Sequence, residues 1–562
     1  MYANTLANGF VWDDVLLIVD NPRIKSWDRI PELVTRPLAQ DTQYYRPLQG
    51  LTFLTDYAVN GLAPAGFHLT NVALHALVAL LFYRVSRMIL RDSVAALVAA
   101  LLFAVHPIHT EAVAYLAGRT DSLAALFLLS ALLLYRSPYL SAGAFLLALL
   151  ARESALVLVP LVILLEAGGV VAPRRRLERY GAYAVVMALY AAMRATFLGD
   201  QPVHIANAAI PLGTRLLTMP KVVLSYLALL VLPLRLHMER RVFPATSVLD
   251  PSFLGPASVL FLFATLLFES RATAWPIVFG ALWFLVALLP FANVIPLDAF
   301  MAEHWLYVPS MGVFMAAGWS VARSLRRPRR GPVAAVALAV VLAAYSARTM
   351  SRNREWATEA SIFEATVRDS PSSFRALSNL GRVYLEAGDP ERALDFLTQA
   401  LARASTPRDE AIVHANRALA HGLAGRHADA VREYRRAIEL KGADAQIYTN
   451  LAGTYLAMGQ SDEAKQALEE AIATDPGYAP AYNNLGVVLE EMGDREHARE
   501  AYLNAIRIDP DSMEAYVGLG DIQLADGHPD LAERSFRAAL RLQPHSTDVQ
   551  ERLQRALDAQ RR

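Results

Sequence analysis

The chain has 562 residues, of which 54% are hydrophobic, and its mean hydropathy is +0.28. Its 53 basic and 53 acidic side chains balance, and it contains no cysteine. These values exclude a disulfide scaffold, a cysteine-ligated metal site and a thiol nucleophile, and they argue against nucleic acid as a partner. Charge is sparse before residue 350 and dense after it. We therefore expect an all-α protein with two bodies, the first of them in a membrane.

Apolar runs of near-bilayer length recur from about residue 70 to 350. Several are shorter than the roughly 20 residues that cross hydrocarbon in one pass, so we expect those runs to tilt, break or pair. The runs cover residues 69–90, 93–106, 120–136, 139–150, 154–168, 178–198, 253–269, 273–290, 305–323 and 331–349.

Arginine-rich corners set the orientation of these spans, because Lys and Arg in short loops stay on the cytoplasmic side. If all three corners lie on the cytoplasmic side, residues 139–166 must form a short helical pair with Arg152 and Glu153 at its outer tip. It also requires the segment Leu216–Leu236 to lie along the outer surface. The corners contain Arg84, Arg87 and Arg91; Arg174, Arg175, Arg176 and Arg179; and Arg323, Arg326, Arg327, Arg329 and Arg330. The outer face then receives residues 1–68, 106–120, 199–252, 291–304 and everything after 350.

The opening loop, residues 1–68, carries the adjacent acids Asp13 and Asp14. Paired carboxylates at a membrane surface can supply one general base and one group that orients it or binds a cation. Adjacent acids are also frequent in ordinary loops, so the pair alone leaves both interpretations open. Export of this loop needs a preceding in-to-out helix, and we expect the natural start to lie upstream. Mapping the translation start tests that expectation.

Polar residues also gather at the outer end of the first span, where His68, Asn71 and His75 share one helical face. A polar face inside a membrane is a functional candidate, with a structural hydrogen-bond network as the alternative. Arg46 stands in the preceding loop.

The next outer loop contains His106, His109 and Glu111. These residue types bind metals, but Pro107 breaks the helix that would align them and no HExxH motif is present, so we predict no metal site. We prefer a polar cup in which an arginine binds phosphate, since guanidinium pairs bidentately with phosphate oxygens. Mutual neutralisation of Arg152 and Glu153 is the alternative. The remaining candidates for the cup are Arg119, Asp121, Glu303 and His304.

After residue 372 the sequence repeats every 34 residues, which is the period of tetratricopeptide repeats. Each unit is expected to form two helices around a glycine turn, with small alanines at the contact and proline ending the second helix. We predict five repeats over 372–545 and a capping helix over 546–562. The periodic residues are Gly425, Gly459, Gly493 and Gly527; Ala430, Ala464, Ala498 and Ala532; and Pro476, Pro510 and Pro544.

Four asparagines occupy the same position of successive repeats. An amide offers both a donor and an acceptor, so a ladder of amides can hold the backbone of an extended peptide. The ladder resembles that of the cytosolic O-linked N-acetylglucosamine transferase, although asparagine at this position is also common in such repeats generally. The four are Asn379, Asn416, Asn450 and Asn484, and the fifth repeat has Gly518 instead.

Together, the motifs stand in the order of a known family, the transmembrane O-mannosyltransferases with tetratricopeptide repeats, which the chain resembles over nearly its whole length. The motifs are Phe10-Val11-Trp12-Asp13-Asp14, Tyr45-Arg46-Pro47-Leu48, Gly66-Phe67-His68-Leu69-Thr70-Asn71, His106-Pro107-Ile108-His109-Thr110-Glu111, Gly118-Arg119-Thr120-Asp121, Arg152-Glu153, Leu306-Tyr307-Val308-Pro309-Ser310-Met311-Gly312 and Arg352-Asn353-Arg354-Glu355-Trp356. The resemblance implies a polytopic glycosyltransferase of the GT-C fold that takes a sugar from a polyprenyl phosphate on the non-cytoplasmic side, followed by an α-solenoid.

The resemblance also implies roles for individual residues. Asp13 and Asp14 fall on the family's catalytic motif, where one carboxylate deprotonates the acceptor hydroxyl. The family loop that usually reads Ala-Glu-Arg is Ala302-Glu303-His304 here, and His is the weaker phosphate partner unless it is protonated. The family's first membrane helix is also missing from this sequence. Positions implied to bind the donor are Arg46, His68, His106, His109, Glu111, Arg119, Asp121, Arg152, Glu153, Glu303 and His304.

We therefore expect transfer of a sugar, mannose by resemblance, to a protein Ser or Thr that the repeats present. The predicted parts are the catalytic loop 1–68, the membrane domain 69–350, the junction 351–371 and the repeats. The scarcity of Lys beside abundant Arg indicates a bacterial member in an inner membrane, with undecaprenyl or decaprenyl phosphate as donor lipid and with site and repeats on the periplasmic side. Whether the reaction needs a divalent cation is left open by the sequence. The rival is a catalytically inactive membrane-anchored repeat scaffold for envelope complexes; a transporter is less favoured.

Overall fold

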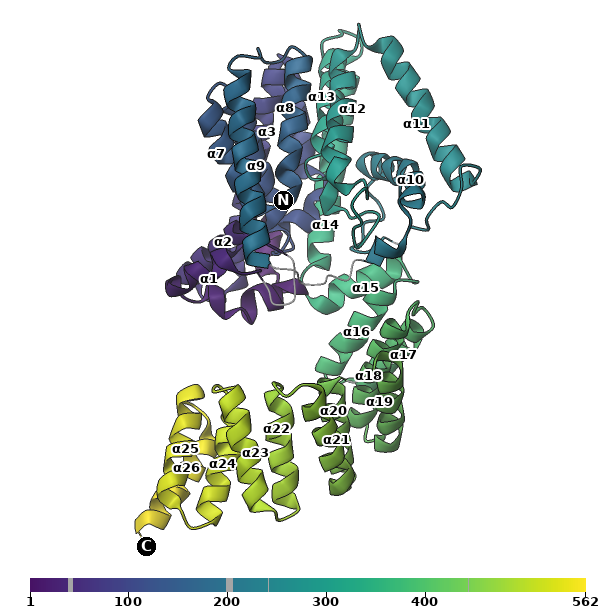
Figure 1. Ribbon diagram of the computed structural model, residues 1–562. Helices are drawn as coiled ribbons and strands as arrows, with labels where there is room; N and C mark the ends of the chain where they lie inside the picture. The colour runs from purple at the N-terminus through teal and green to yellow at the C-terminus, as the bar shows by residue number, and fades with distance from the viewer. Residues whose placement is uncertain (39–43, 199–205, 241, 443, 562) are drawn as a thin grey trace. The chain divides into compact units, whose positions relative to one another are not determined.

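The computed structural model describes residues 1–38, 44–198, 206–240, 242–442 and 444–561. It consists of two units, Met1–Pro371 and Ser372–Arg562 (Figure 1). Every regular element in the described residues is helical, apolar helices fill the first unit, and helical repeats fill the second. The predicted all-α class, with membrane helices followed by tetratricopeptide repeats, is confirmed.

The first unit is a bundle of apolar helices with short helical turns at one end. The α-helices are α1 (Ile30–Thr35), α2 (Pro47–Asn60), α3 (Pro64–Leu90), α4 (Ser93–Val105), α5 (Thr110–Val113), α6 (Arg119–Leu133), α7 (Pro138–Ala151), α8 (Leu158–Ala167), α9 (Arg176–Leu198), α10 (Leu212–Val231), α11 (Pro251–Ser270), α12 (Trp275–Leu288), α13 (Ser310–Leu325), α14 (Gly331–Glu355) and α15 (Glu359–Asp369). Short helical turns of this unit include η1 (Tyr2–Ala7), η2 (Val15–Val19), η6 (Glu153–Val157) and η9 (His304–Leu306).

Five of these helices, α3, α9, α10, α11 and α14, are long and apolar enough to cross a membrane. The helices on either side of Pro107 meet at a bend of 51°, as expected for a proline that interrupts a helix. Figure 1 shows α10 nearly end-on while α9 and α13 are seen from the side, so α10 runs across the bundle. The placement of Leu216–Leu236 along the outer surface stays a prediction, since α10 is also long and apolar enough to cross.

The short apolar runs resolve into a helical pair. Helix α7 ends at Ala151, Arg152 adopts an extended backbone, and η6 and α8 follow. Neither α7 nor α8 reaches the roughly 20 residues of a single crossing. One expectation needs correction, because the opening segment is not simply a loop: residues 47–60 form α2, which begins with proline at its first turn.

Close helix contacts build the core of the bundle. The backbones of α12 and α13 approach so closely that a Cβ on Gly280 would overlap the Gly312 carbonyl oxygen. Small residues permit this approach, which is the usual means of packing helices in lipid. The arginine-rich corners lie at the end of the bundle away from α1 and α2 (Figure 1). There Arg326 pairs with Asp92 at 2.7 Å.

The second unit is a row of five helix pairs and a final helix. Alanines at the predicted contact position, such as Ala430 and Ala464, are fully buried, and the turn glycines have positive φ, for example 72° at Gly425. The helices are α16 (Phe374–Glu386), α17 (Pro390–Leu401), α18 (Pro407–Leu423), α19 (His427–Lys441), α20 (Ala445–Ala457), α21 (Ser461–Thr474), α22 (Ala479–Glu491), α23 (Arg495–Ile508), α24 (Met513–Ala525), α25 (Pro529–Leu542) and α26 (Thr547–Arg561).

Candidate functional site

The N-terminal segment is fastened to the end of α14 by side-chain amides. Asn8 donates to the Asn353 carbonyl oxygen at 2.9 Å, and Asn353 donates to the Asn4 side chain at 2.7 Å. The Gly9 amide donates to the Ala357 carbonyl oxygen at 3.0 Å. These contacts join residues about 345 positions apart, and they place the segment that follows, with its two acids, against the helix bundle.

The two acids have different environments. Asp14 is fully buried, and its carboxyl oxygens accept from the Ala117 amide at 2.8 Å and the Val11 amide at 3.1 Å. Burial raises the pKa of Asp14 to about 8, and the neighbouring Asp13 charge adds to the increase. Asp13 keeps intermediate exposure. Asp14 therefore holds the loop in place, whereas Asp13 is partly exposed.

A stack of aromatic rings lies beside the acids. The ring of Tyr115 stacks between Trp12, at a centroid distance of 5.6 Å, and Trp356, at 5.1 Å. Trp12 has a left-handed backbone with φ 54°, which is uncommon for a bulky residue. Burial raises the pKa of the Tyr115 hydroxyl, and the charges of Asp13 and Asp14 add to the effect. The hydroxyl therefore stays protonated near Asp13.

Arg119 is fully buried and all of its nitrogens are used inside the protein. It pairs with Asp56 at 2.5 Å, donates to the Asn71 side chain at 2.6 Å, and donates to the Phe67 carbonyl oxygen at 2.9 Å. A further bond reaches the Thr52 hydroxyl at 3.2 Å. With these partners Arg119 joins α2, α3 and α6, and each of its three nitrogens already contacts a protein atom.

The predicted histidines are also internal. His75 contacts the Tyr307 hydroxyl at 2.7 Å, His106 contacts the Leu230 carbonyl oxygen at 3.1 Å, and His109 contacts the Phe103 carbonyl oxygen at 2.8 Å. His68 is fully buried. For His75, His106 and His109 the geometry favours the structural hydrogen-bond network over direct donor contacts. No group of three or more His, Asp or Glu suited to a metal occurs among the described residues.

Arg46 and Arg152 border the outer tip of the α7–α8 pair. Arg46 pairs with Glu153 at 3.4 Å, and Arg152 pairs with Asp121 at the start of α6. Arg152 and Glu153 were expected, in one alternative, to neutralise each other, but each has a different partner. One oxygen of Asp121 and the Nε of Arg152 are buried without a hydrogen bond in the described part of the chain. The hydrogen-bonding capacity of this pair is therefore not fully used within the described part of the protein.

A small pocket opens beside this pair. Its polar lining is Asp121, Ser154 and His304, and the stacked rings of Phe291 and Trp305, 4.9 Å apart, form one wall. The rest of the lining is apolar and includes Leu128, Val157 and Ala287. The pocket thus combines a polar edge with hydrocarbon walls.

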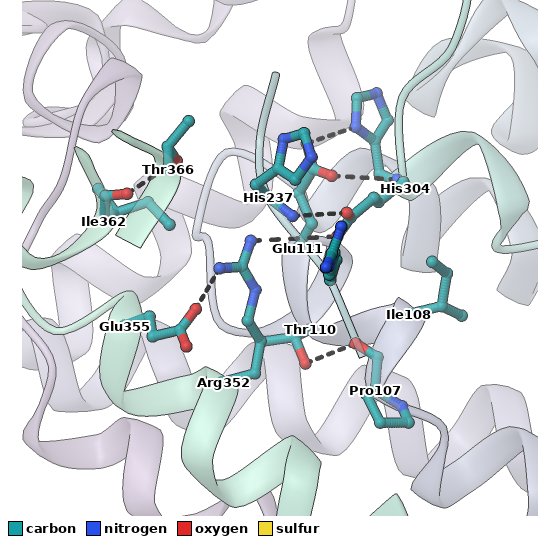
Figure 2. A network of polar contacts seen from close by, with 12 residues as sticks. Pro107, Ile108, Thr110, Glu111, His237, His304, Arg352, Glu355, Ile362 and Thr366 are labelled. Carbon is teal, nitrogen blue, oxygen red and sulfur yellow. Dashed lines mark hydrogen bonds and ion pairs between the residues drawn. The ribbon is translucent and has the colours of Figure 1, made fainter. Parts of the chain in front are cut away.

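A second charged network adjoins the pocket (Figure 2). His304 donates its backbone amide to Glu111 at 3.2 Å, and its ring Nδ1 lies 2.6 Å from the other Glu111 oxygen. Glu303 accepts from Arg240 at 2.8 Å and from the His237 amide at 2.7 Å. Burial raises the pKa of Glu303, while the Arg240 and Arg352 guanidiniums oppose the increase. Glu303 is therefore committed to protein partners, whereas His304 still faces the pocket.

The four asparagines of the repeats lie on the first helices of their pairs. Asn379, Asn416, Asn450 and Asn484 belong to α16, α18, α20 and α22, and each is half-buried. Asn484 also lines a small pocket between α20 and α22, together with Gly453, Leu456 and Val487. The missing fifth asparagine has a steric reason, because a Cβ on Gly518 would overlap the Tyr502 ring.

Four participants were absent from the sequence predictions: Asp56, Tyr115, Arg240 and Arg352. Asp56 is the lone charge of α2, and a lone buried charge needs a partner, so that signal was available. Arg352 belongs to a motif quoted for the resemblance, but its role as a cation near Glu111 and Glu303 depends on folding. Tyr115 and Arg240 give no comparable signal in the sequence.

Comparisons with known proteins match both units. Tetratricopeptide repeat families match residues 376–443, 423–486 and 484–547. The chain is 27% identical over 470 residues to the protein O-mannosyl-transferase TMTC3 of Mus musculus, covering 71% of this chain and 49% of that protein. It is 42% identical over 143 residues to TMTC1 of Homo sapiens, covering 24% and 16%. The crystal structure of MamA is 26% identical over 30% of this chain and 97% of its own, with a TM-score of 0.27.

The chain spans about half the length of the Mus musculus relative. The protein O-mannosyl-transferase F38B6.6 of Caenorhabditis elegans is 25% identical over 69% of this chain and 59% of its own length. These relatives and the repeat matches confirm the resemblance to the transmembrane O-mannosyltransferases with tetratricopeptide repeats that the ordered motifs indicate.

Proposed function

We propose that the protein is an integral-membrane glycosyltransferase that moves mannose from a polyprenyl phosphate to a protein Ser or Thr hydroxyl. The observation that carries the proposal is the division of roles between the two acids, because Asp14 fixes the loop and leaves Asp13 accessible. The named relatives support the reaction class.

Asp13 is the general base of the proposed reaction. The acceptor oxygen attacks the anomeric carbon of mannose, its proton passes to the Asp13 carboxylate, and the bond from that carbon to the phosphate oxygen breaks. The electron pair leaves with the polyprenyl phosphate. Asp14, whose raised pKa of about 8 keeps it protonated near neutral pH, is unsuited to accept that proton.

The pocket beside Arg152 is the proposed donor site. Its polar edge, with Asp121 and His304, receives the phosphate and sugar, and its apolar walls receive the first units of the lipid. The incompletely bonded Arg152 supplies a guanidinium to a phosphate oxygen. The arginine-rich corners at the opposite end of the bundle support a site on the outer, non-cytoplasmic face. The lipid is then undecaprenyl or decaprenyl phosphate in a bacterial inner membrane.

The repeats hold the acceptor in this proposal. The amides of Asn450 and Asn484 bond the backbone of an extended peptide, and the pocket beside Asn484 receives one of its aliphatic side chains. Tetratricopeptide repeats form extended concave surfaces that bind partners in this way.

Sugar transfer in membranes tests the proposal directly. Membranes containing the protein are given radiolabelled polyprenyl-phosphate mannose and acceptor peptides. We expect transfer by the wild type and a loss of about 10²–10⁴-fold in Asp13→Asn, the usual contribution of a general base. Asp20→Asn, at an exposed acid of the same segment, is the matched control and should retain transfer. No transfer across a panel of sugars and acceptors would favour the inactive scaffold.

The role of the repeats has a separate test. Replacing Asn379, Asn416, Asn450 and Asn484 together by Ala should weaken capture of an unfolded acceptor peptide, measured by fluorescence anisotropy with the full-length protein in detergent. Transfer to a short soluble acceptor at high concentration should persist. Unchanged capture by the fourfold variant would remove the ladder from the proposal.

A further inference from the structure

Two of the arginine-rich corners meet at one end of the helix bundle. The first lies at the end of α3, and the second joins α13 to α14. Helices α4 and α13 pack so closely that a Cβ on Gly318 would overlap a carbonyl oxygen of α4. The Asp92 carboxylate, at the start of α4, pairs with Arg326 at 2.7 Å. These contacts bring residues 84–92 and residues 323–331 together on one surface, which we call the arginine patch.

The arginine patch has a large excess of positive charge. Asp92 is the only acid in the two segments, and Arg326 already pairs with it. The other arginines of the patch are exposed, and none of them forms an ion pair within the described part of the chain. Like charges at this density repel one another, and an anion bound among them relieves the repulsion. These seven residues are Arg84, Arg87, Arg91, Arg323, Arg327, Arg329 and Arg330.

An apolar surface begins directly beside these charges. Helix α14 follows the last arginine of the patch, and it is long and apolar enough to cross a membrane. In its first turns Val333, Val336 and Val340 are 69%, 64% and 60% exposed. The guanidinium of Arg323 lies 5.4 Å from the centre of the Trp319 ring, and tryptophan is typical of the boundary between lipid and water. The surface therefore has the two parts of a phospholipid in the same order, a charged part for the headgroup and an apolar part for the tails.

The orientation rule for membrane proteins accounts for only part of this surface. Arginines in short loops set the topology, which explains why each corner contains them. The rule counts residues in each loop separately and does not require two loops to be joined by helix packing and an ion pair. The convergence of the corners on one surface therefore indicates a binding role in addition to the topological one.

We propose that the arginine patch is a binding site for an anionic phospholipid, with the phosphate among the guanidinium groups and the tails along the first turns of α14. Guanidinium groups bind phosphate oxygens bidentately. The start of α14 has no side-chain cap in the described structure, so its partial positive charge adds to the attraction. Phosphatidylcholine has the same phosphate, but its ammonium group offsets that charge. The patch lies at the end of the bundle away from α1 and α2 (Figure 1), and the proposal does not rest on the proposed function.

Lipid binding to the full-length protein in a neutral detergent tests the proposal. The probe is phosphatidylglycerol labelled on an acyl chain, followed by fluorescence anisotropy, with unlabelled lipids as competitors. We expect phosphatidylglycerol to bind about tenfold or more tighter than phosphatidylcholine with the same tails, because several arginines contribute to the attraction. Changing Arg327, Arg329 and Arg330 together to Gln should remove most of that preference. Changing Arg84 and Arg87 to Gln should also weaken it, because both segments form one site.

Two further conditions distinguish a lipid site from a site for a free anion. Raising the salt from about 0.1 M to about 1 M should weaken binding, because the Debye length falls from about 10 Å to about 3 Å. Inorganic phosphate in excess should displace the labelled lipid far less effectively than unlabelled phosphatidylglycerol, because it has no tails to contact α14. Equal displacement by the two would overturn the proposal.

The matched control removes the same number of charges from exposed positions of the repeat unit. Arg403, Arg499 and Arg541 are changed together to Gln, and binding of phosphatidylglycerol should stay as in the wild type. Thermal unfolding in detergent shows which variants are folded, and the Arg84→Gln, Arg87→Gln variant provides the test if the threefold patch variant does not fold. Equal affinity for phosphatidylglycerol and phosphatidylcholine, or wild-type binding by a folded patch variant, would overturn the proposal.

Discussion

The two units of the molecule differ in how far apart in the sequence their contacting residues lie. In the membrane unit, contacts join positions far apart in sequence, as when Asp14 accepts from Ala117 and Glu111 pairs with His304. In the repeat unit, equivalent positions recur every 34 residues, and buried alanines such as Ala430 and Ala464 serve the same contact in neighbouring pairs. A residue of the first unit therefore has no substitute elsewhere, while most residues of the second have counterparts one period away.

This difference decides where function can be localised. Repeats contact mainly their neighbours, so their stability is close to a sum of local terms, and binding is spread along the row. The membrane unit depends on individual buried ion pairs, and removing one partner leaves a charge without compensation. Substitutions in the two units should accordingly differ in size, and three of them test the comparison.

The largest effect is expected at Arg119, through stability. Replacing Arg119 by Met leaves Asp56 buried without its cation and also removes the bond to Asn71. Breaking a buried pair in this way costs about 3–5 kcal/mol. Thermal unfolding of the protein in detergent should show a large decrease in stability, with sugar transfer lost as a consequence of unfolding.

A matched control for this prediction is Arg174→Met, at an exposed position in an arginine-rich corner. It should change the free energy of unfolding by less than about 0.5 kcal/mol. If Arg119→Met were as stable as the wild type and lost only donor binding, Arg119 would return to the phosphate site that the sequence suggested.

Much of the architecture was predictable because it rests on local signals. Apolar runs located the helices, the proline at 107 located a bend, and the 34-residue period located the repeats. The position of Arg152 at the tip of a short helical pair followed from the arginine-rich corners. These features depend on composition and spacing within a few turns of helix, which a single sequence displays.

The geometry of the site was not predictable in the same way. Nothing within a few residues of Arg119 reveals Asp56 as its partner, and Glu111 lies 193 positions from His304. Periodicity contains no information on such pairings. The acidic pair was found from its motif, yet the separate roles of Asp13 and Asp14 depend on which one the fold buries.

A smaller effect on stability is expected at Gly518, where the fifth repeat lacks the asparagine of the other four. Gly518→Asn would complete the ladder in the fifth repeat, but its Cβ would overlap the Tyr502 ring. Overpacking of this kind costs about 1–3 kcal/mol. Leu468 stands one period before Tyr502 and Asn484 one period before Gly518, so Tyr502→Leu should absorb much of the cost. Urea unfolding of both single variants and the double variant measures the coupling, and additive effects would contradict the steric explanation.

The smallest change in stability is expected at Gly453, where binding should nevertheless change. A Cβ on this glycine of α20 meets no atom within 4 Å, and replacing Gly in a helix by a better helix former contributes up to about 1 kcal/mol of stability. Gly453→Leu should therefore fold at least as well as the wild type while its side chain fills the pocket beside Asn484. Acceptor capture should fall about tenfold or more, because the peptide loses a buried aliphatic side chain worth roughly 1.5–3 kcal/mol.

Gln466→Leu is the control for this variant, since it adds the same side chain at an exposed position of α21 outside the pocket. It should leave capture unchanged, as measured by fluorescence anisotropy with the full-length protein. A Gly453→Leu protein that is stable and still captures the peptide would show that the acceptor does not use the groove between α20 and α22. If Gly453→Leu instead raises the stability of the protein and lowers capture of the peptide, the two roles of the repeat unit, folding and acceptor binding, are separable at one position of its regular sequence.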